Sequence, residues 1–132
     1  MITPITKDFK GLVSITGPTR SGKSHLAEFL LKDKNSVTYI ATSKQRPEDQ
    51  EWVKRIDLHR KRRPNHWTLI EPPFDICEKI NSINENESIL IDSLGGLVEH
   101  HLSENDKFWN NFQNILLKCF TQDNLCIVVV SE

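Results

Sequence analysis

The sequence has few cysteines, little net charge and only short hydrophobic runs. These features disfavour a disulfide-stabilised protein, a strongly charged nucleic-acid-binding protein and a membrane-spanning protein. Its three cysteines, Cys77, Cys119 and Cys126, form no CxxC pair, so we expect reduced thiols buried as small hydrophobic side chains. No apolar run approaches the roughly 20 residues of a membrane-spanning helix, and residues 1–12 lack the hydrophobic core of a secretion signal. These absences favour a soluble protein of the cytoplasm.

Charge is nearly balanced over the whole chain but is unevenly distributed. The formal net charge is -1 and the isoelectric point about 6.5, which gives no general attraction to nucleic acid or to anionic membranes. Between Lys54 and Arg63, however, there are six basic residues and one acid. Only Trp52 and Trp67 lie near this run as stacking partners for bases. The pattern predicts a local anion site and disfavours a nucleic-acid-binding protein.

Short strands alternate with helices along the chain. Most of the expected strands are apolar on both faces, and they cover residues 12–16, 37–42, 66–71, 88–93 and 125–132. The expected helices cover residues 22–32, 47–62, 74–83 and 103–120. This alternation predicts an α/β fold with a mostly parallel sheet and flanking helices. Length and the lack of repeats predict one domain over residues 1–132, with residues 1–11 as a flexible N-terminal extension.

For three of these helices the sequence also predicts which face is apolar or which residue caps the helix. The first has apolar residues at Leu26, Phe29 and Leu30, with Ala27 and Leu31 nearly in phase. The second begins with acids, ends with bases before Pro64, and spaces Trp52, Ile56 and His59 on one stripe that should face the domain or a cleft. The last is expected to start with Ser103 as its N-terminal cap.

Residues 17–24 read GPTRSGKS and match GxxxxGK[ST], with a strand before the motif and a helix after it. The glycines allow a loop whose backbone N–H groups point at phosphates, and the helix adds its positive end. Lys23 is expected to reach the β- and γ-phosphates, and the Ser24 hydroxyl to bind Mg²⁺. The predicted nucleotide contacts are Gly17, Pro18, Thr19, Arg20, Ser21, Gly22, Lys23 and Ser24.

Asp92 follows three apolar residues, and an acid at the end of a neighbouring strand usually supports the magnesium of such a loop. The alternative role for Asp92 is to cap a helix that begins at Leu94. The loop alone leaves the transferred group open, because kinases, switches, motors and nucleotidyl transferases all use it.

His59 lies within the basic run and is a candidate nucleophile. A neutral imidazole can attack phosphorus and form a covalent phosphoramidate. Neighbouring cations would disfavour the imidazolium and neutralise a triphosphate. The alternative, which composition alone favours, is a histidine that caps a helix C-terminus among solvated arginines. His100 and His101 are adjacent and would point apart on a helix, which disfavours a histidine metal site.

Four motifs in one order resemble the bifunctional adenosylcobinamide kinase / adenosylcobinamide-phosphate guanylyltransferase family of cobalamin biosynthesis. They are the loop GPTRSGKS, the strand YIATS (Tyr39–Ser43), the segment R-I-x-x-H-x-x-x-R-P-x-x-W (Arg55–Trp67) and SILIDSLGGLVEHHL (Ser88–Leu102). The resemblance implies an enzyme that phosphorylates adenosylcobinamide with a nucleoside triphosphate, ATP or GTP. It then joins GMP from GTP to that phosphate and releases pyrophosphate.

The resemblance also implies roles for single residues. His59 matches the histidine that carries the guanylyl group, and Lys23 acts with it as the second catalytic residue. Ser24 and Asp92 would hold Mg²⁺, and Arg63 would contact phosphate. The implied fold is a P-loop NTPase-type domain with a parallel sheet, assembled into a ring-like homo-oligomer, commonly a trimer.

The chain departs from this family at two places. After Asp92 the family more often has a threonine and a larger apolar residue, with an asparagine further along, where this chain has Gly95, Gly96 and His100. The resemblance ends at VVVSE, so it implies a sheet that is incomplete at the C-terminus and lacks a covering helix. Two other functions therefore stay open: a non-catalytic nucleotide-binding module, or a small-molecule kinase whose basic helix acts as a phosphate lid.

Overall fold

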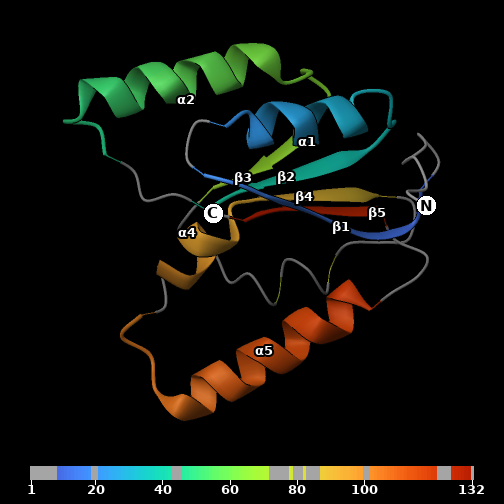
Figure 1. The fold of residues 1–132 in the computed structure, drawn as a ribbon, viewed down its shortest axis with the longest axis vertical. Helices are drawn as coiled ribbons and strands as arrows, with labels where there is room; N and C mark the ends of the chain where they lie inside the picture. Colours follow the sequence, from blue (N-terminus) through green and yellow to red (C-terminus); the bar gives the residue numbers. More distant parts are fainter. Residues whose placement is uncertain are drawn as a thin grey trace.

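A single sheet forms the centre of the computed structural model, which describes residues 9–18, 21–42, 46–71, 78, 82, 87–99, 102–121 and 126–131. Its strands are β1 (Gly11–Thr16), β2 (Val37–Ala41), β3 (Thr68–Ile70), β4 (Ser88–Asp92) and β5 (Cys126–Ser131). They are ordered β1-β5-β4-β2-β3, and each neighbouring pair is parallel (Figure 1). The expected α/β fold with a mostly parallel sheet is confirmed.

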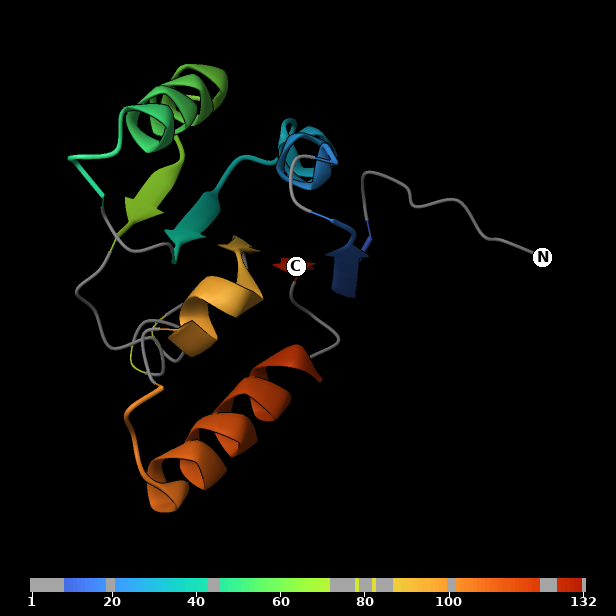
Figure 2. The same ribbon diagram turned by 60° about the vertical axis from the view of Figure 1, so that its left-hand side comes forward.

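Helices cover both faces of the sheet. Helices α1 (Lys23–Leu31) and α2 (Gln50–Arg62) lie on one side, and α4 (Leu94–Glu99) and α5 (Asp106–Phe120) lie on the other (Figures 1 and 2). Apart from Glu78 and Ser82, the helix expected at residues 74–83 lies outside the described residues. No helix among the described residues has the length and apolar character that crossing a membrane requires.

The core has two layers because alternate strand residues point to opposite faces of the sheet. In β4, Ile89 and Ile91 pack with Phe112 of α5, whereas Leu90 packs with Leu31 of α1. The three interior strands, β5, β4 and β2, are therefore buried on both faces, as parallel strands between helical layers should be. Of the expected N-terminal extension, Phe9 packs against the α1-side layer, and Gly11 already begins β1.

Three details of the helices differ from the sequence-based expectations. Helix α2 begins at Gln50, because Asp49 Oδ1 accepts hydrogen bonds from the backbone N–H groups of Glu51 (3.1 Å) and Trp52 (3.2 Å). Helix α5 begins at Asp106, and the prediction of Ser103 as its cap is wrong. Asn105 is the cap, since its Oδ1 accepts from Phe108 N at 2.9 Å.

The third difference concerns which face of α1 is buried. The helix packs Ala27 and Leu31 against the sheet, and it also buries Glu28, whose carboxylate contacts α2. Leu26 and Phe29, which belonged to the expected apolar stripe, are 49% and 56% exposed. The buried face of α1 thus includes a carboxylate, and a buried charge in a protein is normally paired.

Candidate functional site

The loop between β1 and α1 has the backbone conformation that its glycines allow. Gly22 has φ 89° and ψ 13°, the left-handed region that favours glycine, and it directly precedes α1. A Cβ atom added to Gly17 would lie 3.0 Å from Ser21 Oγ. Thr19 and Arg20, two of the predicted nucleotide contacts, lie outside the described residues.

Lys23 is turned into this loop. Its side chain is buried, with the residue 6% exposed, and Nζ donates to the carbonyl oxygen of Pro18 at 2.5 Å and to Ser21 Oγ at 3.5 Å. The ammonium group therefore lies within the loop whose backbone would surround phosphates, together with three of the other predicted contacts, Pro18, Ser21 and Gly22.

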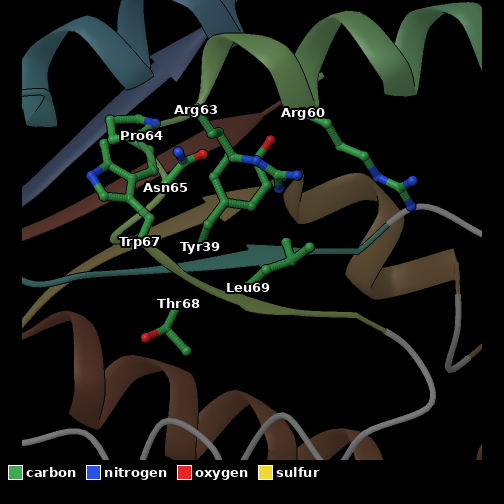
Figure 3. A pocket seen from close by; sticks show the side chains of 8 residues that line it. All are labelled: Tyr39, Arg60, Arg63, Pro64, Asn65, Trp67, Thr68 and Leu69. Carbon is green, nitrogen blue, oxygen red and sulfur yellow. The ribbon is translucent and has the colours of Figure 1, made fainter.

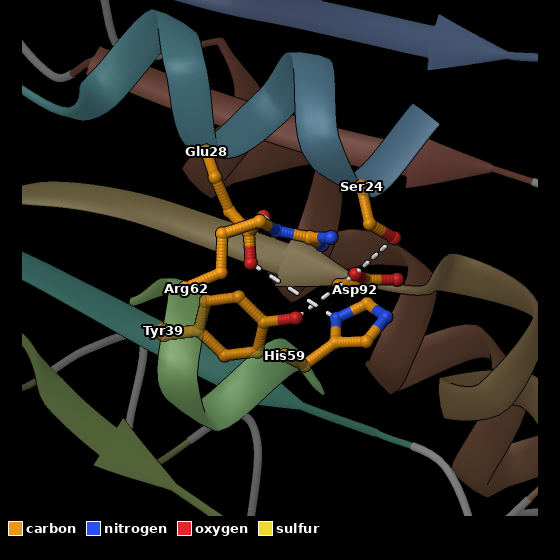
Figure 4. A network of polar contacts seen from close by, with 6 residues as sticks. All are labelled: Ser24, Glu28, Tyr39, His59, Arg62 and Asp92. Atoms are coloured by element: carbon orange, nitrogen blue, oxygen red, sulfur yellow. Dashed lines mark hydrogen bonds and ion pairs between the residues drawn. The ribbon is translucent and has the colours of Figure 1, made fainter. Parts of the chain in front are cut away.

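Ser24 and Asp92 meet although they come from different elements. Ser24 Oγ donates to Asp92 Oδ2 at 2.7 Å, and the Tyr39 hydroxyl donates to the same oxygen at 2.9 Å (Figure 4). Tyr39 reaches Asp92 because β2 and β4 are parallel neighbours. Ser24 reaches it because β1, β5 and β4 are parallel, so the end of β1, where α1 begins, lies at the same edge of the sheet as Asp92. Burial, followed by the Asp92 charge, raises the pKa of Tyr39 well above its ordinary value, which keeps the hydroxyl protonated as a donor.

The alternative role of Asp92 as a helix cap is wrong. Ser93 caps α4 instead: its Oγ accepts from Gly96 N and its carbonyl oxygen from Leu97 N, both at 3.2 Å. Asp92 is the residue before this cap, and its carboxylate is turned toward Ser24 and Tyr39.

Thr42 holds the turn that follows Asp92. Its backbone N–H donates to the Asp92 carbonyl oxygen at 3.0 Å. Its Oγ1 donates to the Ser93 carbonyl oxygen at 2.6 Å and accepts from Ser93 N at 2.7 Å. Thr42 is fully buried, and Gly96 approaches it so closely that an added Cβ would lie 2.4 Å from Thr42 Oγ1. Only glycine therefore fits at position 96 without a shift of Thr42.

His59 lies on the predicted stripe of α2. Trp52, Ile56 and His59 are half-buried, whereas the residues between them are exposed, so the expected orientation toward the domain is confirmed. Burial is the main cause that lowers the pKa of His59, and the nearby Arg62 guanidinium lowers it further, against the opposing Asp92 charge. The shift favours the neutral imidazole, as the sequence predicts, but desolvation contributes more to it than the arginines do.

Glu28 connects His59 to the helix that carries Ser24. The residue is 5% exposed; its Oε2 accepts from Arg62 Nε at 2.5 Å, and its Oε1 lies 4.0 Å from His59 Nδ1 (Figure 4). Burial raises the pKa of Glu28, while Arg62 acts in the opposite direction. Sequence reasoning missed both Glu28 and Arg62. The available signal was the spacing, because Glu28 follows Ser24 by four residues and so shares its helix face.

Arg63 lies over the ring of Tyr39, the residue whose hydroxyl donates to Asp92. Its guanidinium carbon is 4.7 Å from the Tyr39 ring centroid, a cation–π contact. The two residues line a pocket of about 160 Å³ next to β3 (Figure 3). The other lining residues are Arg60, Pro64, Asn65, Trp67, Thr68 and Leu69. Tyr39 thus contacts both places: it lines this pocket, and its hydroxyl donates to Asp92.

The donor set at the loop suits magnesium. Among the described residues, no three His, Cys, Asp or Glu side chains gather as a metal site. Mg²⁺ bound with a nucleotide needs only one or two protein oxygens, since phosphates and water supply the rest. Ser24 Oγ and Asp92 Oδ2 are two such oxygens, 2.7 Å apart. The residues present therefore fit a nucleotide-bound magnesium. His100 and His101 lie outside the described residues.

A parallel sheet with a glycine loop before α1, an inward lysine, and a serine paired with a strand-end acid defines a phosphate-loop nucleotide-binding protein. The fold is similar to the crystal structure of the RadB recombinase, with a TM-score of 0.54 and 22% identity, covering 92% of this chain and 62% of that one. Residues 13–132 match the family described as cobinamide kinase / cobinamide phosphate guanyltransferase, and the chain belongs to this family.

Curated relatives carry the name bifunctional adenosylcobalamin biosynthesis protein. CobU of Escherichia coli is 40% identical over 92 residues, which cover 69% of this chain and 50% of the relative. CobP of Pseudomonas aeruginosa is 35% identical over 121 residues, 89% of this chain and 69% of the relative. The matched segment thus spans half the length of the first and about two thirds of the second. The family resemblance predicted from the four motifs is confirmed.

Proposed function

We propose that this chain is a nucleotide-dependent transferase of cobalamin biosynthesis that phosphorylates adenosylcobinamide and then transfers GMP from GTP through His59. One observation carries the proposal: His59 Nδ1 lies 4.0 Å from Glu28 of the phosphate-loop helix, on the helix face that also presents Ser24 to Asp92. A solvated, helix-capping histidine would not be held neutral by burial against another helix.

The proposed nucleotide site uses the loop from Gly17 to Ser24. The Lys23 ammonium would contact the β- and γ-phosphates, and the loop N–H groups would bind the remaining phosphate oxygens. Ser24 and Asp92 would hold Mg²⁺, which neutralises charge on the phosphates when bound. We propose GTP as the GMP donor, and ATP or GTP as the phosphate donor in the kinase step.

The proposed transfer has two displacements at the α-phosphorus. Neutral His59 attacks, a nitrogen–phosphorus bond forms, and the bond to the leaving pyrophosphate breaks. A phosphate oxygen of adenosylcobinamide phosphate then attacks the same phosphorus, and the nitrogen–phosphorus bond breaks, which restores neutral His59. The lowered pKa of His59 supports this role, because only the neutral ring has a free lone pair.

Intact mass spectrometry after incubation with GTP and Mg²⁺ tests the proposal. We expect an acid-labile mass gain equal to one GMP in the natural chain and in His66→Ala, and no gain in His59→Ala. His66 is a matched control, since it is exposed and its Nε2 lies 3.3 Å from the Lys34 carbonyl oxygen, away from Glu28.

Two other results would reject this function. A chain that binds nucleotide but gains no mass and turns over nothing would be a non-catalytic binding module. Turnover with ATP that does not require GTP, again without an adduct, would indicate a small-molecule kinase.

We further propose a cytoplasmic homo-oligomer, in keeping with the ring-like trimers that the family resemblance implies. Support comes from that resemblance and from the near-neutral charge balance, which also disfavours nucleic acid as a partner. Light scattering at several concentrations would measure the assembled mass, and a constant monomer mass would contradict this proposal.

A further inference from the structure

The Glu28 carboxylate has one oxygen that lacks a hydrogen bond. Oε1 is buried and has no hydrogen-bond partner among the described residues, although Glu28 is only 5% exposed. A buried acceptor without a partner destabilises the folded state, so such an atom needs an explanation. The facing group is the His59 ring, whose Nδ1 lies 4.0 Å away.

Arg62 fixes the orientation of this carboxylate. Its Nε donates to Oε2 at 2.5 Å, and a guanidinium can only donate hydrogen bonds. With Oε2 held in this way, Oε1 is left directed at the imidazole, as Figure 4 shows. The His59 side chain is 22% exposed, and its second ring nitrogen lies on the opposite edge of the ring from Glu28.

We propose that Glu28 is a positioning residue for His59: its Oε1 accepts a hydrogen bond from Nδ1–H, which leaves the lone pair on Nε2 for attack on phosphorus. This inference rests on the proposed function of His59. Closing the 4.0 Å separation to a hydrogen bond of about 2.8 Å needs a shift of about 1 Å, and catalytic hydrogen bonds commonly tighten when substrate binds.

The carboxylate also matters during the transfer. As the Nε2–phosphorus bond forms, pyrophosphate leaves with the electron pair of the broken phosphorus–oxygen bond, and the ring gains a positive charge. The Nδ1 proton stays on the ring, where the Glu28 charge stabilises it. When the acceptor phosphate displaces the ring, the positive charge disappears. Glu28 therefore neither gains nor loses a proton.

Glu28→Gln gives a sharp test because Arg62 is a donor only. The glutamine carbonyl oxygen must face Arg62, so its NH₂ group faces His59 Nδ1 and donates to it. The His59 proton then moves to Nε2, and the nucleophilic lone pair is lost. Glu48→Gln is the matched control, since it makes the same chemical change at an exposed residue before α2.

The first measurement is the tautomer of His59 by ¹⁵N NMR, at a pH above the ordinary histidine pKa of about 6.5. We expect the Nδ1–H form in the natural chain and in Glu48→Gln, and the Nε2–H form in Glu28→Gln. An Nε2–H tautomer in the natural chain would overturn the proposal, and this result requires neither a folded variant nor any turnover.

The second measurement is the single-turnover rate of GMP adduct formation, with the GTP dissociation constant measured beside it. We expect Glu28→Gln to slow adduct formation about 100-fold with little change in the dissociation constant. Equal rates in Glu28→Gln and Glu48→Gln would reject the positioning role while leaving His59 as the carrier. Absence of any adduct in the natural chain would reject the proposed function. The His59 tautomer measured by ¹⁵N NMR would even then test whether Glu28 positions the ring.

Discussion

The two adjacent glycines of α4 should respond to alanine in opposite directions. A Cβ atom on Gly96 would lie 2.4 Å from Thr42 Oγ1 and 3.1 Å from the Thr42 backbone carbonyl atoms. A Cβ atom on Gly95 would meet nothing nearer than Ser93 Oγ at 3.9 Å. The two substitutions make the same chemical change one residue apart in the same helix, so intrinsic helix propensity cancels between them.

The structure sets the size of the effect. Relieving the contact at Gly96 requires Thr42 Oγ1 to move, which breaks its hydrogen bonds of 2.6 and 2.7 Å to Ser93. Broken bonds and overpacking together cost about 3 kcal/mol, and helix propensity returns about 1 kcal/mol. We expect Gly96→Ala to lower the free energy of unfolding by about 2 kcal/mol, and Gly95→Ala to raise it by about 1 kcal/mol.

Thermal unfolding of both variants beside the natural chain measures this difference. In a chain of this length, about 1 kcal/mol shifts Tm by roughly 4 °C, so we expect about 8 °C down for Gly96→Ala and about 4 °C up for Gly95→Ala. Urea unfolding gives the same ordering independently of temperature. If Gly96→Ala were as stable as Gly95→Ala, α4 would not lie as close to Thr42 as described, and Thr42 would not hold the turn after Asp92 in this way.

Further predictions concern the nucleotide site and the core. Asp92→Asn removes a charge but keeps an acceptor for Tyr39, so it should weaken GTP binding about 10- to 100-fold with Mg²⁺ and much less with EDTA, as measured by titration calorimetry. The pKa of His59 should lie below its ordinary value of 6.5 in the free protein. The stability that the neutral ring contributes is therefore lost as pH falls from 6.5 through the pKa of the folded state. An NMR titration of His59 with a midpoint above 6.5 would contradict this. Phe112→Ala, at a side chain 2% exposed, should cost about 3–5 kcal/mol in urea unfolding, and a loss under 1 kcal/mol would show that α5 does not pack on the sheet.

The helices show where sequence patterns succeed and where they fail. The stripe of Trp52, Ile56 and His59 predicted the half-buried side of α2 correctly, because the three residues are spaced in helical phase. In α1, apolar residues surround the helix, so the pattern could not choose a face. The helix turns Glu28 inward and Phe29 outward, because Lys23 and Ser24 must face the loop and Asp92. At α5 two polar residues, Ser103 and Asn105, could each act as the cap, and only the path of the chain selects between them.

Local patterns in the amino-acid order are enough to specify the phosphate loop, the alternation of strands and helices, and the family to which the chain belongs. These features depend on residues close together in the sequence, where spacing fixes geometry. The pairing of Glu28 with His59 and Arg62, the Tyr39 hydroxyl on Asp92, and the bonds between Thr42 and Ser93 join residues far apart in the chain. Only packing α1 and α2 on one parallel sheet brings these groups together. The chemistry proposed for His59 therefore depends on the tertiary structure.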